Sequence, residues 1–144
     1  MNYGRVAVAA LAGWIVDGVY GFVVYGNLMT GQFMSYPGVF RPTAAANANL
    51  PIMFVGILLG MFVAAYVYAK GYDGGSGVAE GLRFGSCIGV FVIGYGVVVN
   101  WAMMNFGRKL ALSMSAASLV EWILVGVTIG LVYQPAASSK GARV

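Results

Sequence analysis

The sequence predicts an all-α fold, an integral membrane protein built as a bundle of four spanning helices. The apolar residues AVILMFWYC make up 60% of the chain and the charged residues DEKR only 8%. Soluble domains carry about a quarter charged residues, so this chain could not cover its own surface with polar groups. Disordered chains are poor in apolar residues, which excludes disorder as well. Four apolar stretches each reach the roughly 20 residues that a helix needs to cross a bilayer.

We predict these spans at residues 6–29, 50–69, 84–106 and 110–133, in one domain of residues 1–134 that is followed by a short polar tail at 135–144. The first span is longer than the apolar core of a signal peptide, so we expect it to be retained. The second span has a start signal, with Asn49 as an N-cap and Pro51 in the first turn.

Three connections of different character join the spans. Residues 30–49 contain aromatic residues and prolines, which indicates a loop in the membrane interface that covers the end of the bundle. Residues 70–83 contain five glycines but lack the GxxxxGK[ST] spacing of a phosphate-binding loop, so we predict a flexible link. The third connection, residues 107–109, is short and predicts an antiparallel hairpin of the last two spans.

Four spans place both termini on one side of the membrane. The basic residues divide five to three between the two sides, with Arg5, Lys70, Arg83, Lys140 and Arg143 on the side of the termini and Arg41, Arg108 and Lys109 on the other. The positive-inside rule therefore predicts cytoplasmic termini, and we expect a bacterial inner membrane.

The composition also excludes several classes of function. The chain has no histidine, the commonest general base and a frequent ligand of haem iron, zinc and copper. A single cysteine, Cys87, excludes an internal disulfide and a cysteine zinc site. The basic residues are scattered rather than gathered in one stripe, which argues against nucleic-acid binding. We expect no enzymatic activity, no metal and no cofactor.

Small residues four positions apart allow close approach of helices in a membrane, where burial of apolar surface does not drive association. Each predicted span has a row at this spacing: Gly13, Asp17 and Gly21; Gly56, Gly60 and Ala64; Gly85 and Gly89; Gly126 and Gly130. On a helical wheel Gly126 lies about 140° from Glu121, so the last span has a polar face and a separate packing face. Two faces indicate two neighbours, and we expect that one neighbour belongs to another chain.

Two carboxyl groups lie in the middle of the predicted spans. Asp17 is 11 residues from Val6, and Glu121 is 12 residues before Tyr133. At about 1.5 Å per residue, both lie roughly 17–18 Å from the same end of the bundle. No Lys or Arg lies at this depth, so three outcomes are open: protonation, hydrogen bonds to neighbours, or a proton shared by the pair. The pair is either structural or a site that binds and releases a proton or cation.

Further residues are candidates to support the two acids. Trp14 and Tyr20 are one turn from Asp17, Ser118 and Thr128 share the face of Glu121, and Asn100 lies closer to the far end of the bundle. Trp14 and Trp122 are candidates for an aromatic cage around an organic cation, although ordinary helix packing is the alternative.

Two segments resemble small bacterial four-helix membrane proteins, namely Gly18-Val19-Tyr20-Gly21 to Tyr25-Gly26 and Leu119-Val120-Glu121-Trp122 to Tyr133. This resemblance covers most of the chain and implies a four-helix fold but no activity. The chain is also similar to small multidrug transporters in having an acid, Asp17, in its first span. Their length and loop pattern are not matched, so no transporter residues are carried over.

Two functions are therefore expected from the sequence. The first is a structural or accessory membrane subunit that works through helix packing in a homo-oligomer or with other membrane subunits in the lipid bilayer. Under it, Gly60→Leu or Gly130→Leu dissociates the complex, whereas Asp17→Asn and Glu121→Gln retain assembly and function. The second is a small proton-coupled transporter or channel that uses Asp17 and Glu121.

Overall fold

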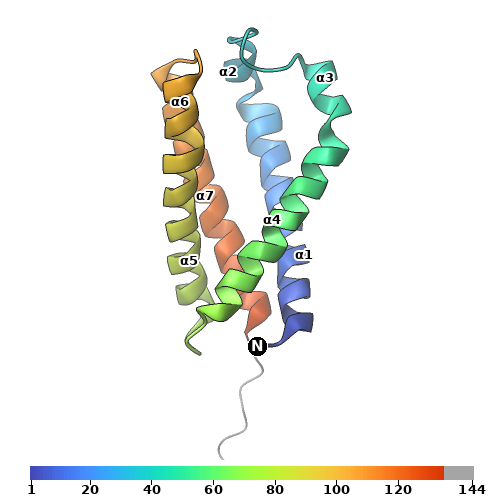
Figure 1. The fold of residues 1–144 in the computed structure, drawn as a ribbon, viewed down its shortest axis with the longest axis vertical. Coiled ribbons are helices and arrows are strands. Elements are labelled where there is room, and N and C mark those ends of the chain that lie inside the picture. The colour runs from blue at the N-terminus through green and yellow to red at the C-terminus, as the bar shows by residue number, and fades with distance from the viewer. Residues whose placement is uncertain (135–144) are drawn as a thin grey trace, which may run out of the picture.

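A computed structural model describes residues 1–134, and every regular element in this range is a helix (Figure 1). The elements are α1 (Tyr3–Val23), η1 (Val24–Leu28), α2 (Thr30–Met34), α3 (Thr43–Ala48), α4 (Leu50–Lys70), α5 (Gly77–Phe91), η2 (Val92–Val98), α6 (Val99–Met103) and α7 (Arg108–Tyr133), where η1 and η2 are π-helical. The predicted all-α class is confirmed. The predicted polar tail lies outside the described residues.

Four helices are long and apolar enough to cross a membrane: Tyr3–Leu28, Leu50–Lys70, Gly77–Met103 and Arg108–Tyr133. The predicted four-span bundle is confirmed, but the third span was placed wrongly at 84–106. It begins seven residues earlier, and the predicted flexible link shrinks to residues 71–76. The reason is that Gly77 and Gly81 lie in α5 and pack directly against α7. The last connection is residues 104–107, so Arg108 and Lys109 belong to the first turn of α7.

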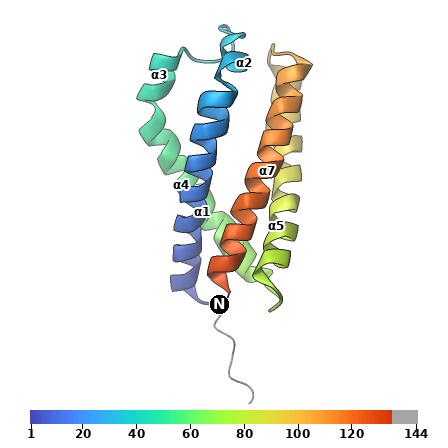
Figure 2. The same cartoon turned by 180° about the vertical axis from the view of Figure 1, so that it is seen from behind.

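The spans are not arranged in chain order. α5 packs along α7, α7 along α1, and α1 along α4, whereas α4 touches α7 only slightly. Seen from behind, α1 and α7 run side by side with α4 and α5 beyond them (Figure 2). α4 crosses α1 at an angle and separates from the other spans toward its own start (Figure 1). One end of the bundle carries the N-terminus and the end of α7, and the other carries α2, α3 and α6 (Figure 1). We call these the N-terminal end and the α2–α3 end.

Buried residues are concentrated at the N-terminal end. A core of eleven buried residues joins α1, α4 and α7 there: Val6, Ala9, Ala10, Met61, Ala64, Ala65, Tyr68, Ala69, Val125, Ile129 and Tyr133. The α2–α3 end holds a smaller cluster of Met29, Phe106, Leu110 and Ala117, against which aromatic residues of the 30–49 connection pack. The two ends of the bundle are therefore packed very differently.

The contact between α5 and α7 is made by glycines. An added Cβ would overlap backbone of the opposite helix at Gly77, Gly81 and Gly85, and equally at Gly126 and Gly130. Hydrogen in place of a side chain lets the two backbones touch, which maximises dispersion contacts where lipid offers no hydrophobic driving force. This contact fixes α7 in the middle of the bundle.

The connection between α4 and α5 is closed by hydrogen bonds. The Glu80 carboxylate, in the first turn of α5, accepts hydrogen bonds from the backbone N–H groups of Gly75 at 2.6 Å and Asp73 at 3.3 Å. Gly74 adopts a φ of +88°, which favours glycine. At the other end of α4, Pro51 is in the first turn as predicted, but Asn49 does not cap the helix, because its side-chain amide donates back to the carbonyl of Ala45.

Candidate functional site

The two acids come together between the adjacent spans α1 and α7. Asp17 and Glu121 are each only 9% exposed, and their carboxyl groups are near enough for the two charges to interact. Asp17 lies 14 residues from Tyr3 and Glu121 lies 12 residues from Tyr133, so at about 1.5 Å per residue both are roughly 18–21 Å from the N-terminal end. This is the middle of a hydrocarbon core about 30 Å thick. A charge at that depth is costly, so both groups are functional-site candidates.

Glu121 belongs to a hydrogen-bond network that joins α1–η1 to α7. The Tyr25 hydroxyl donates to Oε2 of Glu121 at 2.9 Å and lies 3.3 Å from Oγ of Ser118. Because the single phenol proton goes to Glu121, the Ser118 hydroxyl is the donor to the Tyr25 oxygen. Tyr20 adds a third link, since its hydroxyl donates to the carbonyl of Ala117 at 2.9 Å. The network lies on the side of Glu121 that faces the α2–α3 end.

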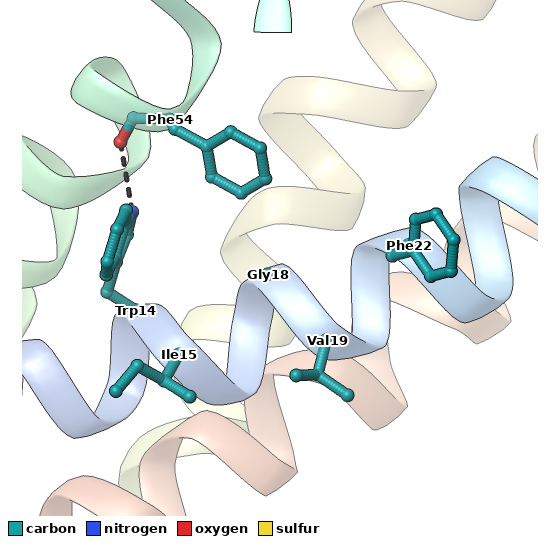
Figure 3. A pocket seen from close by; sticks show the side chains of 6 residues that line it. All are labelled: Trp14, Ile15, Gly18, Val19, Phe22 and Phe54. Carbon is teal, nitrogen blue, oxygen red and sulfur yellow. Dashed lines mark hydrogen bonds between the residues drawn. The ribbon is translucent and has the colours of Figure 1, made fainter. Parts of the chain in front are cut away.

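Asp17 is different, because within residues 1–134 its carboxyl group makes no hydrogen bond to protein. Tyr20, predicted as its donor, bonds to Ala117 instead. Trp14, the other predicted donor, donates its indole N–H to the carbonyl of Phe54 on α4 at 3.0 Å (Figure 3). The Asp17 carboxyl therefore contributes no side-chain hydrogen bond that would stabilise the fold of the described residues.

Other predicted supporting residues lie away from the pair. Thr128 is half-buried, and its hydroxyl donates to the carbonyl of Leu124, one turn before it. Asn100 is exposed, with its amide donating to the carbonyl of Gly96. Trp122 faces α5, where its Cβ lies against Gly89. Of the six predicted supporting residues, Ser118 is linked to Glu121 by way of the Tyr25 hydroxyl. The ring of Tyr20 packs edge to face against the ring of Tyr25.

Tyr25 is the residue that sequence reasoning missed. An α-helical wheel places it about 80° away from Asp17. Tyr25 lies in η1, however, where the π-helical turn changes the register of the faces. Side chains of a helix also lean toward its N-terminus, which brings the phenol back toward the membrane centre. The feature of the sequence that could have identified Tyr25 is a long, hydroxyl-bearing side chain about two turns beyond a buried acid.

The predicted packing rows have mixed outcomes. Gly85, Gly89, Gly126 and Gly130 lie in the α5–α7 contact, and a Cβ at Gly13 would meet Ile129 and Met61. Ala64 is buried in the core at the N-terminal end. Gly56 and Gly60 have no atom of the described chain within 4 Å of an added Cβ, and Gly21 meets only the ring of nearby Tyr25. These three do not pack between helices of this chain.

The two faces of α7 each meet a helix of the same chain. The face with Glu121 and Ser118 contacts α1, and the face with Gly126 and Gly130 contacts α5. Gly77, Gly81 and Gly18 also make close contacts that were not predicted, the last against the ring of Phe54. For Gly77 and Gly81 the signal was present, since they continue the four-residue spacing of Gly85 and Gly89.

A separate apolar cavity of about 320 Å³ lies between α1 and α4, lined by Trp14, Ile15, Gly18, Val19, Phe22 and Phe54. Trp14 and Phe54 stand edge to face, with ring centroids 6.0 Å apart, and the other side chains point along the outer face of α1 (Figure 3). The predicted aromatic cage is not formed, because Trp14 contacts α4 while Trp122 contacts α5.

The chain was compared with protein-family models, curated proteins and solved structures. No protein-family model, curated protein or solved structure matches the sequence or the fold. Its four apolar helices make this chain a multi-pass membrane protein, with a buried acid pair between its first and last spans.

Proposed function

We propose that this chain is a small transporter or channel in which Asp17 and Glu121 bind and release a cation during transport. The observation that carries the proposal is Asp17, a buried carboxyl at mid-membrane depth that makes no hydrogen bond within the described chain and lies beside a second buried carboxyl. A purely structural acid would be retained for its hydrogen bonds, as Glu121 is bonded by Tyr25. Asp17 contributes none, so a role outside stability accounts for it better.

The arrangement is suited to binding one cation at a time. Both acids lie on α1 and α7, and Lys and Arg lie nearer to the helix ends throughout the described spans. Two carboxylates without a cation repel each other in a medium of low dielectric, and one bound positive charge removes that repulsion. Binding is therefore favoured, and release toward water follows when the pair becomes hydrated. The proposed role is transport, not an enzymatic reaction.

Flux in proteoliposomes tests this proposal. Purified protein is reconstituted with a pH-sensitive or a Na⁺-sensitive dye inside, and the flux driven by an imposed pH or Na⁺ gradient is followed for the unchanged protein, Asp17→Asn and Glu121→Gln. We expect flux that collapses in Asp17→Asn. Asp73→Asn is the matched control, because Asp73 is a carboxyl in the exposed connection, with a side chain 80% accessible. Equal flux in the unchanged protein and Asp17→Asn would overturn the proposal.

A second candidate function, a helix-packing subunit of a larger membrane complex, is supported by one observation on α4. Gly56 and Gly60 form an open four-residue row with no neighbour from the described chain. Such a row suits close approach of another helix, from a second copy or another subunit. Gly60→Leu is expected to dissociate such a complex in mild detergent, as measured by native mass spectrometry, with Val63→Leu as the control on a neighbouring exposed position. Gly130→Leu does not test assembly with another chain, because Gly130 packs against α5 within this chain.

A further inference from the structure

The surroundings of the acid pair distinguish between cations that it could hold. Hard metal cations such as Mg²⁺ and Ca²⁺ take about six to eight oxygen ligands, and transporter ion sites draw many of them from carbonyls of broken helices. Here α1 is continuous around Asp17 and α7 is continuous around Glu121, so their carbonyls are used within the helices. Within residues 1–134, the side-chain oxygens hydrogen-bonded to Glu121, directly or through one further group, are those of Tyr25 and Ser118. This set is too small for a metal cation, whereas a proton needs one oxygen.

Few other titratable groups face the pair. Tyr20 and Tyr25 do so from the first span, and both are engaged in hydrogen bonds. On α4 the nearest titratable group packed into the bundle is Tyr68, which belongs to the core at the N-terminal end. On α5 and η2, Cys87 and Tyr95 are exposed. Protonation of the pair is thus decided by the two acids, the two tyrosines and the water that reaches them.

The packing on the two sides of the pair is unequal. Toward the N-terminal end, Gly13, Ala10, Ala9 and Val6 of α1 are all buried, and they face a continuous buried series on α7. Toward the α2–α3 end, Ser118 and Ala117 on α7 are buried, but no residue is buried from Gly18 to Leu28, from 111 to 116 or from 50 to 60. Beyond that stretch the apolar cluster of Met29, Phe106, Leu110 and Ala117 closes the bundle, with partly buried side chains of the first span, α7 and the 30–49 connection packed against it.

The stretch from Gly18 to Leu28 contains the π-helical segment η1, and a second π-helical segment, η2, follows α5. η1 carries Tyr25, and η2 lies along the other side of α7. π-helical turns occur often at functional sites, and they weaken the regular hydrogen-bond ladder of a helix. The hydrogen-bond series Ser118, Tyr25, Glu121 runs through this stretch. Local opening is therefore easier toward the α2–α3 end than through the glycine and alanine contacts at the N-terminal end.

We infer that Asp17 and Glu121 form a proton site that exchanges with water at the α2–α3 end, past Tyr25 and Ser118. This rests on the proposed function and names its substrate as the proton. A hydrated proton entering from that end forms an O–H bond with one carboxylate oxygen, and the pair then carries one negative charge instead of two. The core at the N-terminal end stays closed in this state, so proton release to the other side requires a second arrangement of the spans.

Thiol labelling tests the side of access. In a Cys87→Ser background, Ser118→Cys and Ala10→Cys are exposed to a membrane-impermeant cationic thiol reagent from each face of sealed vesicles. Arg41→Cys and Ser76→Cys, in the connections at opposite ends, identify which face is which. We expect Ser118→Cys to react only from the face that labels Arg41→Cys, and Ala10→Cys to react from neither. Reaction of Ser118→Cys from the Ser76 face, or from neither face, would contradict the inference.

Infrared absorption tests the identity of the ligand. The carbonyl stretch of protonated carboxyl groups is recorded while pH is stepped at constant Na⁺, and then while Na⁺ is stepped at constant pH. The double variant Asp17→Asn with Glu121→Gln identifies the contribution of the pair. We expect this contribution to respond to pH and not to Na⁺, and its loss on addition of Na⁺ would overturn the inference.

The two proposals fail in distinguishable ways. Flux driven by a Na⁺ gradient, or labelling from the Ser76 face with flux intact, would reject the proton site and keep cation transport. Sided labelling and a pH-dependent carboxyl band without flux would keep the proton site and reject transport.

Discussion

The Tyr25 hydroxyl donates a 2.9 Å hydrogen bond to Oε2 of Glu121, and this contact ties the π-helical end of the first span to the middle of the last. The two residues are 96 positions apart in the chain. Glu121 therefore has a structural partner that Asp17 lacks, and the difference between the two acids leads to measurable consequences.

Removal of the Tyr25 hydroxyl should weaken the α1–α7 contact. Tyr25→Phe deletes the bond to Glu121 and the bond from Ser118 while keeping the ring, and side-chain hydrogen bonds between membrane helices contribute about 0.6–1.7 kcal/mol. We expect a loss of about 1–2 kcal/mol in the free energy of unfolding, measured by titration with a denaturing detergent. Tyr95→Phe is the control, since Tyr95 is 72% exposed and stacks on Phe91. Equal losses in both variants would contradict the role of the network.

The two acids should differ in their effect on stability. Glu121→Ala leaves the Tyr25 hydroxyl without its carboxylate acceptor, which costs about 1–3 kcal/mol for an unpaired buried group. Asp17→Ala removes a buried polar group that makes no hydrogen bond within the described chain, so we expect no loss of stability. The same detergent titration measures both. A destabilisation by Asp17→Ala as large as that by Glu121→Ala would show that Asp17 has a structural role.

Glycines that look alike in the sequence should respond differently to a methyl group. In Gly85→Ala the new Cβ would meet the carbonyl oxygen of Trp122, and overpacking of this kind costs about 1–3 kcal/mol. In Gly60→Ala the Cβ enters open space, and alanine has the better helix propensity by up to about 1 kcal/mol. The midpoint temperature of thermal unfolding in detergent should therefore be lower for Gly85→Ala than for the unchanged protein, and equal or higher for Gly60→Ala. The reverse order would refute the α5–α7 glycine contact.

The Glu80 side chain should protect the connection between α4 and α5. Its carboxylate accepts hydrogen bonds from the N–H groups of Gly75 and Asp73 outside the spanning segments. In Glu80→Ala we expect amide hydrogen exchange at Gly75 to become at least several-fold faster, because the amide loses its acceptor. Glu80→Gln retains a carbonyl acceptor and should lie between the two. No change in exchange at Gly75 in Glu80→Ala would contradict this role.

The fold class followed from the sequence because length and apolar composition decide it, and four spans were evident. The start of the third span was missed because Gly77 and Gly81 make that segment look like a loop, although glycine at this spacing is what a close α5–α7 contact needs. The sequence also did not indicate that Gly56 and Gly60 face outward. In water a polar stripe marks the exposed face of a helix, but in lipid both faces of α4 are apolar.

The acid pair was found from sequence because a charge in the middle of a span is conspicuous, and equal depth put both residues at one level. Its partners were harder to predict. Trp14 was expected beside Asp17 but donates to the Phe54 carbonyl on α4, a choice that depends on how α1 and α4 cross. Tyr25 was overlooked because its direction depends on a π-helical turn, for which the sequence offered no recognisable signal.

The spatial order α4, α1, α7, α5 has a consequence for how the protein is made. α7 leaves the ribosome after the other three spans, yet α1 and α5 both need it as their neighbour. Until α7 inserts, Asp17 is in the bilayer without Glu121 beside it, and the glycine face of α5 is exposed to lipid. Completion of the site and closure of this bundle therefore coincide with insertion of α7, and a chain that stops before α7 has neither.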